Sequence, residues 1–150
     1  MRDAHSEDPG ATEQRDAEIV RATWAKVAPH RRVAAAVFYA RLFRLAPEAR
    51  PLFRDDMEAQ AAKLADTIAF VVEHIDDEAT LVPAARELAR RHLDYHVTAE
   101  QYDQVGEALL WTLRELLGPA FGPDEEAAWA RVYAAIASVM VAEAYGHAPK

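Results

Sequence analysis

The sequence predicts an all-α protein, and three observations support this. Apolar residues recur with the period of a helix from about residue 12 to about residue 146, no run alternates apolar and polar residues over the length of a strand, and nearly all β-branched residues fall inside the helical patterns. A chain of 150 residues fits a single domain. We therefore expect one helical domain over residues 12–146, between a disordered polar tail at residues 1–11 and a short tail at residues 147–150.

The first two helices are each expected to end before a proline. An apolar stripe over residues 19–27 ends before Pro29, and a second stripe over residues 33–43 ends before Pro47. Proline lacks the backbone N–H that a helix interior needs, and it pushes the preceding residue out of the helical region. The pattern therefore predicts two amphipathic helices that are separated at Pro29.

The middle of the chain is expected to form a short helix and then two longer ones. Residues 48–53 should form a turn-like helix, cut by Pro51, and residues 57–74 should form a long helix. Pro83 is expected in the first turn of the next helix, where its fixed φ is favourable and its missing N–H costs nothing. This next helix contains His92.

The last two helices have clear end signals. Thr98 and Gln101 have the spacing of a capping box, which should open a helix over residues 99–117, and Gly118 should close that helix. Pro123 is followed by three acidic residues, which favour a helix start because they complement the helix dipole. No internal repeat and no second domain is expected.

Composition excludes several classes of function. The 25 acidic and 17 basic residues give a formal charge of -8, which disfavours binding to nucleic acid or to an anionic membrane surface. No apolar run is expected to span a membrane, and the polar first residues do not resemble a signal peptide, so we expect a cytoplasmic protein. With no cysteine, disulfides, thiolate metal sites and covalently attached haem are excluded.

The segment around His92 is the first candidate for a binding site. Leu88 and His92 are four residues apart, so they share a helix face on which an imidazole could meet a flat apolar cofactor. Arg90 and Arg91 are expected to point elsewhere. Taken alone, such a histidine is more often a partly buried residue with satisfied hydrogen bonds than a metal ligand. The ligand interpretation therefore needs other segments to complete a pocket.

Two further groups of residues could line the same pocket, because the members of each group lie one helical turn apart. Each group also has an ordinary interpretation, which is core packing for the apolar residues and partial or full exposure for the polar ones. The residues are Tyr39 and Phe43 in the second helix, and Gln60, Lys63, Leu64 and Thr67 in the long helix.

Several segments, taken in one register, show a family resemblance. They are residues 38–43, 46–53, 60–64, 90–92, 102–110 and 128–133. Together they resemble the single-domain bacterial globins and the globin half of the flavohaemoglobins, over about residues 12–146. Within this family the detailed pattern is most similar to the Hell's Gate type of globin and its thermophile relatives, and secondarily to the neuroglobins. The resemblance implies a globin fold, a three-over-three helical sandwich around one haem.

The resemblance implies that the cofactor is non-covalent haem b, iron protoporphyrin IX. His92 matches the residue that binds the iron through a neutral imidazole nitrogen. Phe53 matches a phenylalanine that stacks on the porphyrin. Leu64, Leu88 and Val97 match apolar haem contacts, which would exclude water from the pocket.

The resemblance also implies how a gas ligand is held. Tyr39 and Gln60 match a distal pair whose hydroxyl and amide donate hydrogen bonds to a bound diatomic ligand, and such donors are most effective in a dry pocket. Lys63 could pair with a haem propionate or remain solvated. His96 could lie beside a propionate or, with His92 at i, i+4 spacing, bind Zn²⁺, although the sequence offers no third zinc ligand.

One position departs from the flavohaemoglobin pattern. Tyr102 matches the tyrosine of a proximal histidine, tyrosine and glutamate triad, but the glutamate position falls on Ala144. Glu143 is one residue away and hence about 100° around the helix. The electron-donating effect of a complete triad is therefore not expected.

The resemblance implies a haem globin that binds O2, NO and CO reversibly. Oxygen binding and storage, and NO dioxygenation or another detoxification of NO or nitrite, are the expected functions. No Gly-x-Gly-x-x-Gly fingerprint is present, so an external flavin or NAD(P)H reductase would be needed. The alternatives are a haem-based gas sensor and a globin-fold interaction module without haem.

Overall fold

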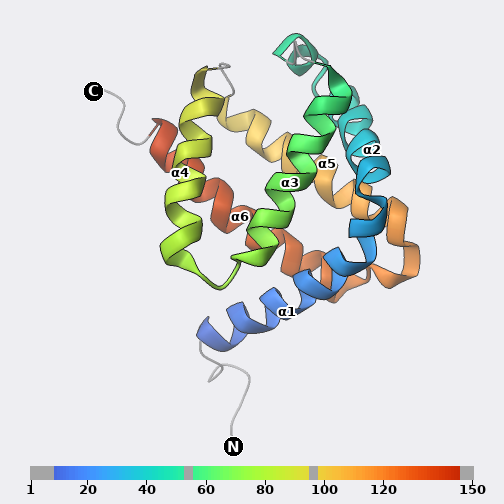
Figure 1. Cartoon of the computed structure of the whole chain (residues 1–150), viewed down its shortest axis with the longest axis vertical. Helices are drawn as coiled ribbons and strands as arrows, with labels where there is room; N and C mark the ends of the chain where they lie inside the picture. Colours follow the sequence, from blue (N-terminus) through green and yellow to red (C-terminus); the bar gives the residue numbers. More distant parts are fainter. Residues whose placement is uncertain (1–8, 53–55, 95–97, 146–150) are drawn as a thin grey trace, which may run out of the picture.

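A computed structural model describes residues 9–52, 56–94 and 98–145 (Figure 1). Over these residues the chain is helical and has no strand, which confirms the all-α prediction. The α-helices are α1 (Pro9–Val27), α2 (Arg31–Leu45), α3 (Met57–Glu73), α4 (Glu78–Asp94), α5 (Ala99–Leu117) and α6 (Pro123–Tyr145), and the 3-10 helices are η2 (Ala28–His30), η3 (Pro47–Leu52) and η4 (Gly118–Ala120).

Two helices begin earlier than the sequence suggested. α1 begins at Pro9, three residues before the expected boundary of the domain. α4 begins at Glu78, because the backbone N–H groups of Thr80 and Leu81 already donate to the carbonyl of Asp77. Pro83 therefore lies inside α4, and the prediction that it occupies the first turn is wrong. Its ring removes one hydrogen bond from the interior of this helix.

The capping signals around α5 are confirmed. The Thr98 hydroxyl accepts the N–H of Gln101 at 3.2 Å, and the Gln101 side chain accepts the N–H of Thr98 at 2.9 Å. At the other end Gly118 has a φ of 54°, a backbone conformation that residues other than glycine rarely adopt. Both ends of α5 are thus fixed by local sequence.

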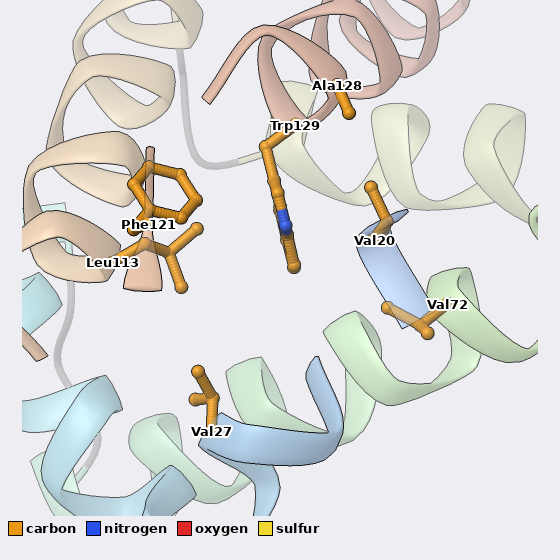
Figure 2. Close-up of a cluster of buried hydrophobic side chains, with 7 residues drawn as sticks. All are labelled: Val20, Val27, Val72, Leu113, Phe121, Ala128 and Trp129. Carbon is orange, nitrogen blue, oxygen red and sulfur yellow. The ribbon is translucent and has the colours of Figure 1, made fainter. Parts of the chain in front are cut away.

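The helices pack as two layers of three. α1, α3 and α4 form one layer and α2, α5 and α6 the other, with α2 against α3 and α5, α1 against α3 and α6, and α4 against α6 (Figure 1). The largest buried cluster joins α1, α3, α5, α6 and the residues that follow η4 (Figure 2). It consists of Val20, Val27, Val72, Leu113, Phe121, Ala128 and Trp129. This core lies at the α1 end of the domain and holds the two layers together.

α6 corrects the expectation that no apolar segment is long enough to span a membrane. Its segment Pro123–Ala144 is long and apolar enough to cross a membrane by length and composition, whereas no such segment was expected. A central helix of a globular bundle has the same properties, and α6 packs against α1, α4 and α5. Arg131 of α6 also donates to both carboxylate oxygens of the buried Asp16 in α1, at 2.8 and 2.9 Å. α6 thus packs against three helices of the bundle, and 17% of its apolar segment is buried among the described residues.

Gly106 in α5 permits a close helix contact, and its replacement by alanine is expected to destabilise the protein. A Cβ at this position would lie 2.7 Å from Cε2 of the Tyr133 ring. Alanine in a helix normally stabilises by about 1 kcal/mol relative to glycine, but overpacking costs about 1–3 kcal/mol. We expect Gly106→Ala to lower the free energy of unfolding, measured with urea. The additional change Tyr133→Leu should recover part of the loss, and a more stable Gly106→Ala protein would contradict this prediction.

Candidate functional site

A cavity of about 290 Å³ lies between α3 and α4, with α6 at its base. Most of its lining is apolar, and its polar residues Asp66, Thr67 and Arg91 are exposed or half-buried. The apolar lining residues are Phe70, Val71, Leu81, Ala84, Ala85, Leu88 and Ile136. Mostly apolar cavities with a few polar groups are typical of small-molecule sites. This cavity is therefore the candidate functional site.

The two walls of the cavity are supported from behind and joined at one end. α3 packs against α1 and α2, and α4 packs against α6. The chain passes from α3 to α4 at a tight corner, residues 74–77, where the N–H of Asp77 donates to the carbonyl of His74. The separation of the two walls thus depends on this corner and on the helices behind each wall.

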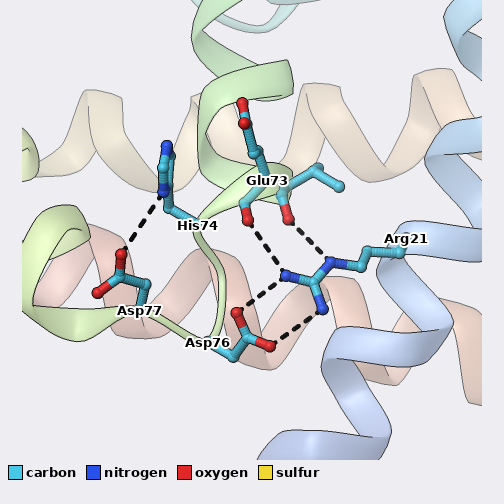
Figure 3. Close-up of polar contacts among 6 residues, drawn as sticks. Arg21, Glu73, His74, Asp76 and Asp77 are labelled. Carbon is cyan, nitrogen blue, oxygen red and sulfur yellow. Dashed lines mark hydrogen bonds and ion pairs between the residues drawn. The ribbon is translucent and has the colours of Figure 1, made fainter.

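Arg21 of α1 fixes the corner (Figure 3). Its guanidinium donates to the carbonyls of Val72 and Glu73 at 3.2 Å, and to both carboxylate oxygens of Asp76 at 2.9 and 3.1 Å. The hydrogen bonds from Arg21 lower the pKa of Asp76, so this carboxyl stays ionised. One side chain thereby satisfies two carbonyls at the end of α3 and holds the loop that leads into α4.

The α4 wall, called the proximal wall below, presents a continuous face to the cavity. Leu81, Ala84 and Leu88 line it at the spacing of one helix face, and His92 lies one turn further along α4. His92 is therefore on the cavity side of the helix by register, and its side chain lies outside the part that the structure describes. The predicted contact of Leu88 with the pocket is consistent with this lining, since the cavity is bounded by Leu88.

The arginines beside His92 differ from the expectation. Arg90 does point away from the cavity, because it donates to Glu143 of α6 at 2.7 Å and to Glu87 at 3.2 Å. Arg91, in contrast, lines the cavity, so the prediction that it points elsewhere is wrong. The physical reason is its spacing of three residues from Leu88 and seven from Ala84, which places it on the same face.

Tyr39 lies in a second apolar cluster beside the start of α3. Its ring meets Phe38 edge-on at 5.1 Å and stacks on Phe43 at 5.9 Å between ring centroids. Leu64 of α3 packs against the same cluster and also lines a smaller cavity of about 20 Å³. Burial raises the pKa of Tyr39 to about 12, so its hydroxyl is a neutral donor at physiological pH.

The other predicted residues of α3 follow one another along the helix. Gln60 is half-buried one turn before Leu64, and Lys63 is exposed. Thr67 lines the large cavity, and its hydroxyl donates to the carbonyl of Lys63 at 2.8 Å. Leu64 lines the smaller cavity and Thr67 the larger one, whereas Gln60 lines neither. α3 therefore connects the Tyr39 cluster to the large cavity, and the common face of Gln60, Leu64 and Thr67 stays a prediction.

Tyr102 is buried directly behind the proximal wall. It forms a cluster with Ala85 and Ala89 of α4 and Met140 of α6, and its backbone carbonyl accepts a hydrogen bond from the Tyr133 hydroxyl. Tyr102 therefore packs behind α4 rather than in the cavity lining, and its role in a proximal triad stays a prediction.

The Glu143 carboxylate is held by arginines of α4. It accepts from Arg90, and its other oxygen lies 3.9 Å from Nε of Arg86. Ala144, the next residue, is half-buried. Glu143 is therefore tied to the arginines of α4, and the incomplete triad stays a prediction.

Three predicted contacts, Phe53, His96 and Val97, lie outside the described residues. Among the residues that the structure does describe, no three His, Asp or Glu side chains are grouped so as to hold a metal ion, and the zinc alternative thus gains no third ligand there. Sequence reasoning missed Phe70, Leu81, Ala84 and Ile136 as lining residues. The helical spacing of Leu81, Ala84 and Leu88 would have indicated that Leu81 and Ala84 share a helix face with Leu88.

The lining of the cavity suits an apolar group whose polar edge reaches solvent. Aliphatic and aromatic side chains cover its walls, the polar lining residues are partly exposed, and one of them is a cation, Arg91. Haem has this chemistry, because its porphyrin is apolar and its two propionates are anionic. The residues present are therefore compatible with haem held between α3 and α4.

Comparisons with known proteins agree with this geometry. Residues 36–140 match the model of the globin family. The chain is 34% identical to a flavohemoprotein of Halalkalibacterium halodurans over 131 residues, which cover 85% of this chain and 32% of that protein. It is 33% identical to a flavohemoprotein of Chromobacterium violaceum (82% of this chain, 31% of that protein) and 36% identical to one of Vibrio cholerae (69% and 27%). The chain spans about a third of the length of these relatives.

Proposed function

Since the chain belongs to the globin family, and therefore binds haem and a diatomic gas, we propose that it stores O2 and uses it to convert NO to nitrate. One NO, one O2 and one electron give one nitrate ion. We propose a separate flavin- and NAD(P)H-dependent reductase as the electron donor and the cytoplasm as the location. The likeness to the Hell's Gate type of globin and to the neuroglobins stays a prediction.

His92 is the proposed iron ligand. It follows Leu88 by one turn on the cavity side of α4, and a neutral imidazole nitrogen is a common ligand of iron. Bound haem supplies an iron centre that takes a gas ligand and exchanges electrons. The apolar side chains of the cavity, among them Phe70, Leu88 and Ile136, would exclude water from the porphyrin.

The buried hydroxyl of Tyr39 is the observation that most supports the gas-binding role. Tyr39 belongs to an apolar cluster against which Leu64 of α3 packs, and in apolar surroundings a hydrogen bond is stronger than in water. Gln60, one turn before Leu64, would supply an amide as a second donor. Both side chains would orient a gas ligand and stabilise negative charge that develops on it.

The proposed reaction is tested with the purified haem protein, NADH and a flavin reductase. Under air we expect added NO to be consumed catalytically, with nitrate formed in a one-to-one ratio, as followed with an NO electrode and by nitrate analysis. The reductase alone and the Tyr39→Phe protein are the controls, and the variant should be slower. If O2 binds normally but NO consumption stays at the rate of the reductase alone, the dioxygenase proposal is wrong and the protein is a carrier or a sensor.

A further inference from the structure

The last turns of α4 contain three arginines in different surroundings. Arg86 and Arg90 lie on the side of α6, where both approach the carboxylate of Glu143 and Arg90 also pairs with Glu87. Arg91 is about 100° around the helix from Arg90 and borders the cavity. The three side chains are exposed, so exposure does not explain the difference. The direction of each side chain follows from its place on the helix.

Arg91 brings a positive charge to a mostly apolar cavity. Within the described part of the chain, no carboxylate lies in ion-pair contact with it, whereas Arg86 and Arg90 each have one. Asp66 is also a lining residue, but it belongs to α3, the facing wall. An anion in the cavity would therefore be attracted to the α4 side, where Arg91 lies, and repelled by the α3 side, where Asp66 lies.

Arg91 is also next to the proposed iron ligand. Adjacent Cα atoms are about 3.8 Å apart, so the edge of a flat group held at His92 would be within reach of the Arg91 side chain. A guanidinium has a planar set of donors that matches a carboxylate in two parallel hydrogen bonds. A carboxylate at the edge of a flat apolar ligand is the anion that fits this position.

We infer that Arg91 binds a propionate of the haem and so fixes how the porphyrin is seated between the two walls. The inference rests on haem binding by this cavity. Arg91 is a positioning residue, because it acts on the edge of the cofactor and not on its iron. Lys63, the cation first considered for this role, is not among the residues that line the cavity. Asp66 on the facing wall would repel the same propionate.

The experiment compares haem loss from the Arg91→Gln protein and from the unaltered protein. Each is loaded with haem or with haem dimethyl ester, which lacks the propionate charges, and haem transfer to an excess of an acceptor apoprotein is followed by absorbance. We expect Arg91→Gln to speed the loss of haem about two- to fivefold, as for the loss of one exposed ion pair, and to leave the loss of the ester unchanged. Arg86→Gln, on the other side of α4, is the matched control and should change neither rate.

A second variant tests whether a negative charge in the cavity has the opposite effect on the rate of haem loss. Asp66→Asn removes the acidic side of the cavity and should slow the loss of haem, again without effect on the ester. Equal acceleration of both porphyrins by Arg91→Gln, or no acceleration of either, would overturn the inference and leave haem binding intact. If the unaltered protein shows no Soret band when haem is added, the haem assignment itself fails.

Discussion

Replacing His92 with alanine is expected to abolish stable haem binding. The imidazole is the proposed bond between the chain and the iron, and the remaining contacts in the cavity are apolar packing and one charged edge. Such contacts can retain porphyrin weakly, but they cannot hold the iron in one coordination state. The absorbance of the freshly purified variant should lack the Soret band of the unaltered protein. Full retention of the native spectrum would show that another residue binds the iron.

Two controls separate coordination from folding. His30→Ala removes an exposed histidine from η2, remote from the cavity, and should leave the Soret band unchanged. His92→Gly leaves space for added imidazole, which should restore the band if the position is on the iron. Helical circular dichroism of both His92 variants shows whether the domain has folded. Failure of imidazole to restore the band in a folded protein would count against the ligand assignment.

Replacing Tyr39 with phenylalanine is expected to speed O2 dissociation about ten- to a hundredfold. This range corresponds to a hydrogen bond of about 1.5–3 kcal/mol, the strength typical of bonds to charged groups in dry surroundings. Phenylalanine keeps the ring contacts with Phe38 and Phe43 and removes only the hydroxyl. Stopped-flow measurement of the off-rate tests this prediction. Tyr133→Phe, whose hydroxyl bonds the backbone of α5, is the control and should be nearly neutral.

The pH dependence follows from the burial of Tyr39. Burial raises its pKa in the folded protein to about 12, whereas the unfolded value is about 10. The off-rate of the unaltered protein should therefore stay constant up to about pH 10. Between about pH 10 and about pH 12 only the unfolded chain loses this proton, so the free energy of unfolding should fall there. The Tyr39→Phe protein should lose this part of the decrease when both are unfolded with urea.

The sequence predicted elements whose signals are local. The capping box at Thr98 and Gln101 and the glycine that ends α5 depend on residues that are close in the chain, and all are present in the structure. Pro83 shows the limit of such signals. It is favourable in a first turn, but the backbone bonds to Asp77 start the helix earlier, and the rest of α4 tolerates a missing hydrogen bond.

The candidate site was only partly predictable, because its surroundings depend on tertiary packing. Helical spacing indicated that Leu88 and His92 share a face. Which other residues of α4 line the cavity depends on the side of the helix that packs against α6. This contact turns Arg86 and Arg90 toward Glu143 and leaves Arg91 at the cavity. Ile136 could not be assigned from α6 alone, since nearly every residue around it, from 132 to 142, is apolar.

The orientation of α3 relative to α4 depends on the corner that Arg21 holds. α3 and α4 run antiparallel from it (Figure 1), so Gln60 and His92 are each about fourteen residues away, or about 21 Å at the rise of a helix. At this length a rotation of about 3° at the corner moves either position by about 1 Å, a displacement that can change a reaction rate about a hundredfold. Arg21, remote from the proposed gas-binding residues, would thus help to set the distance between Gln60 and the proposed iron ligand His92.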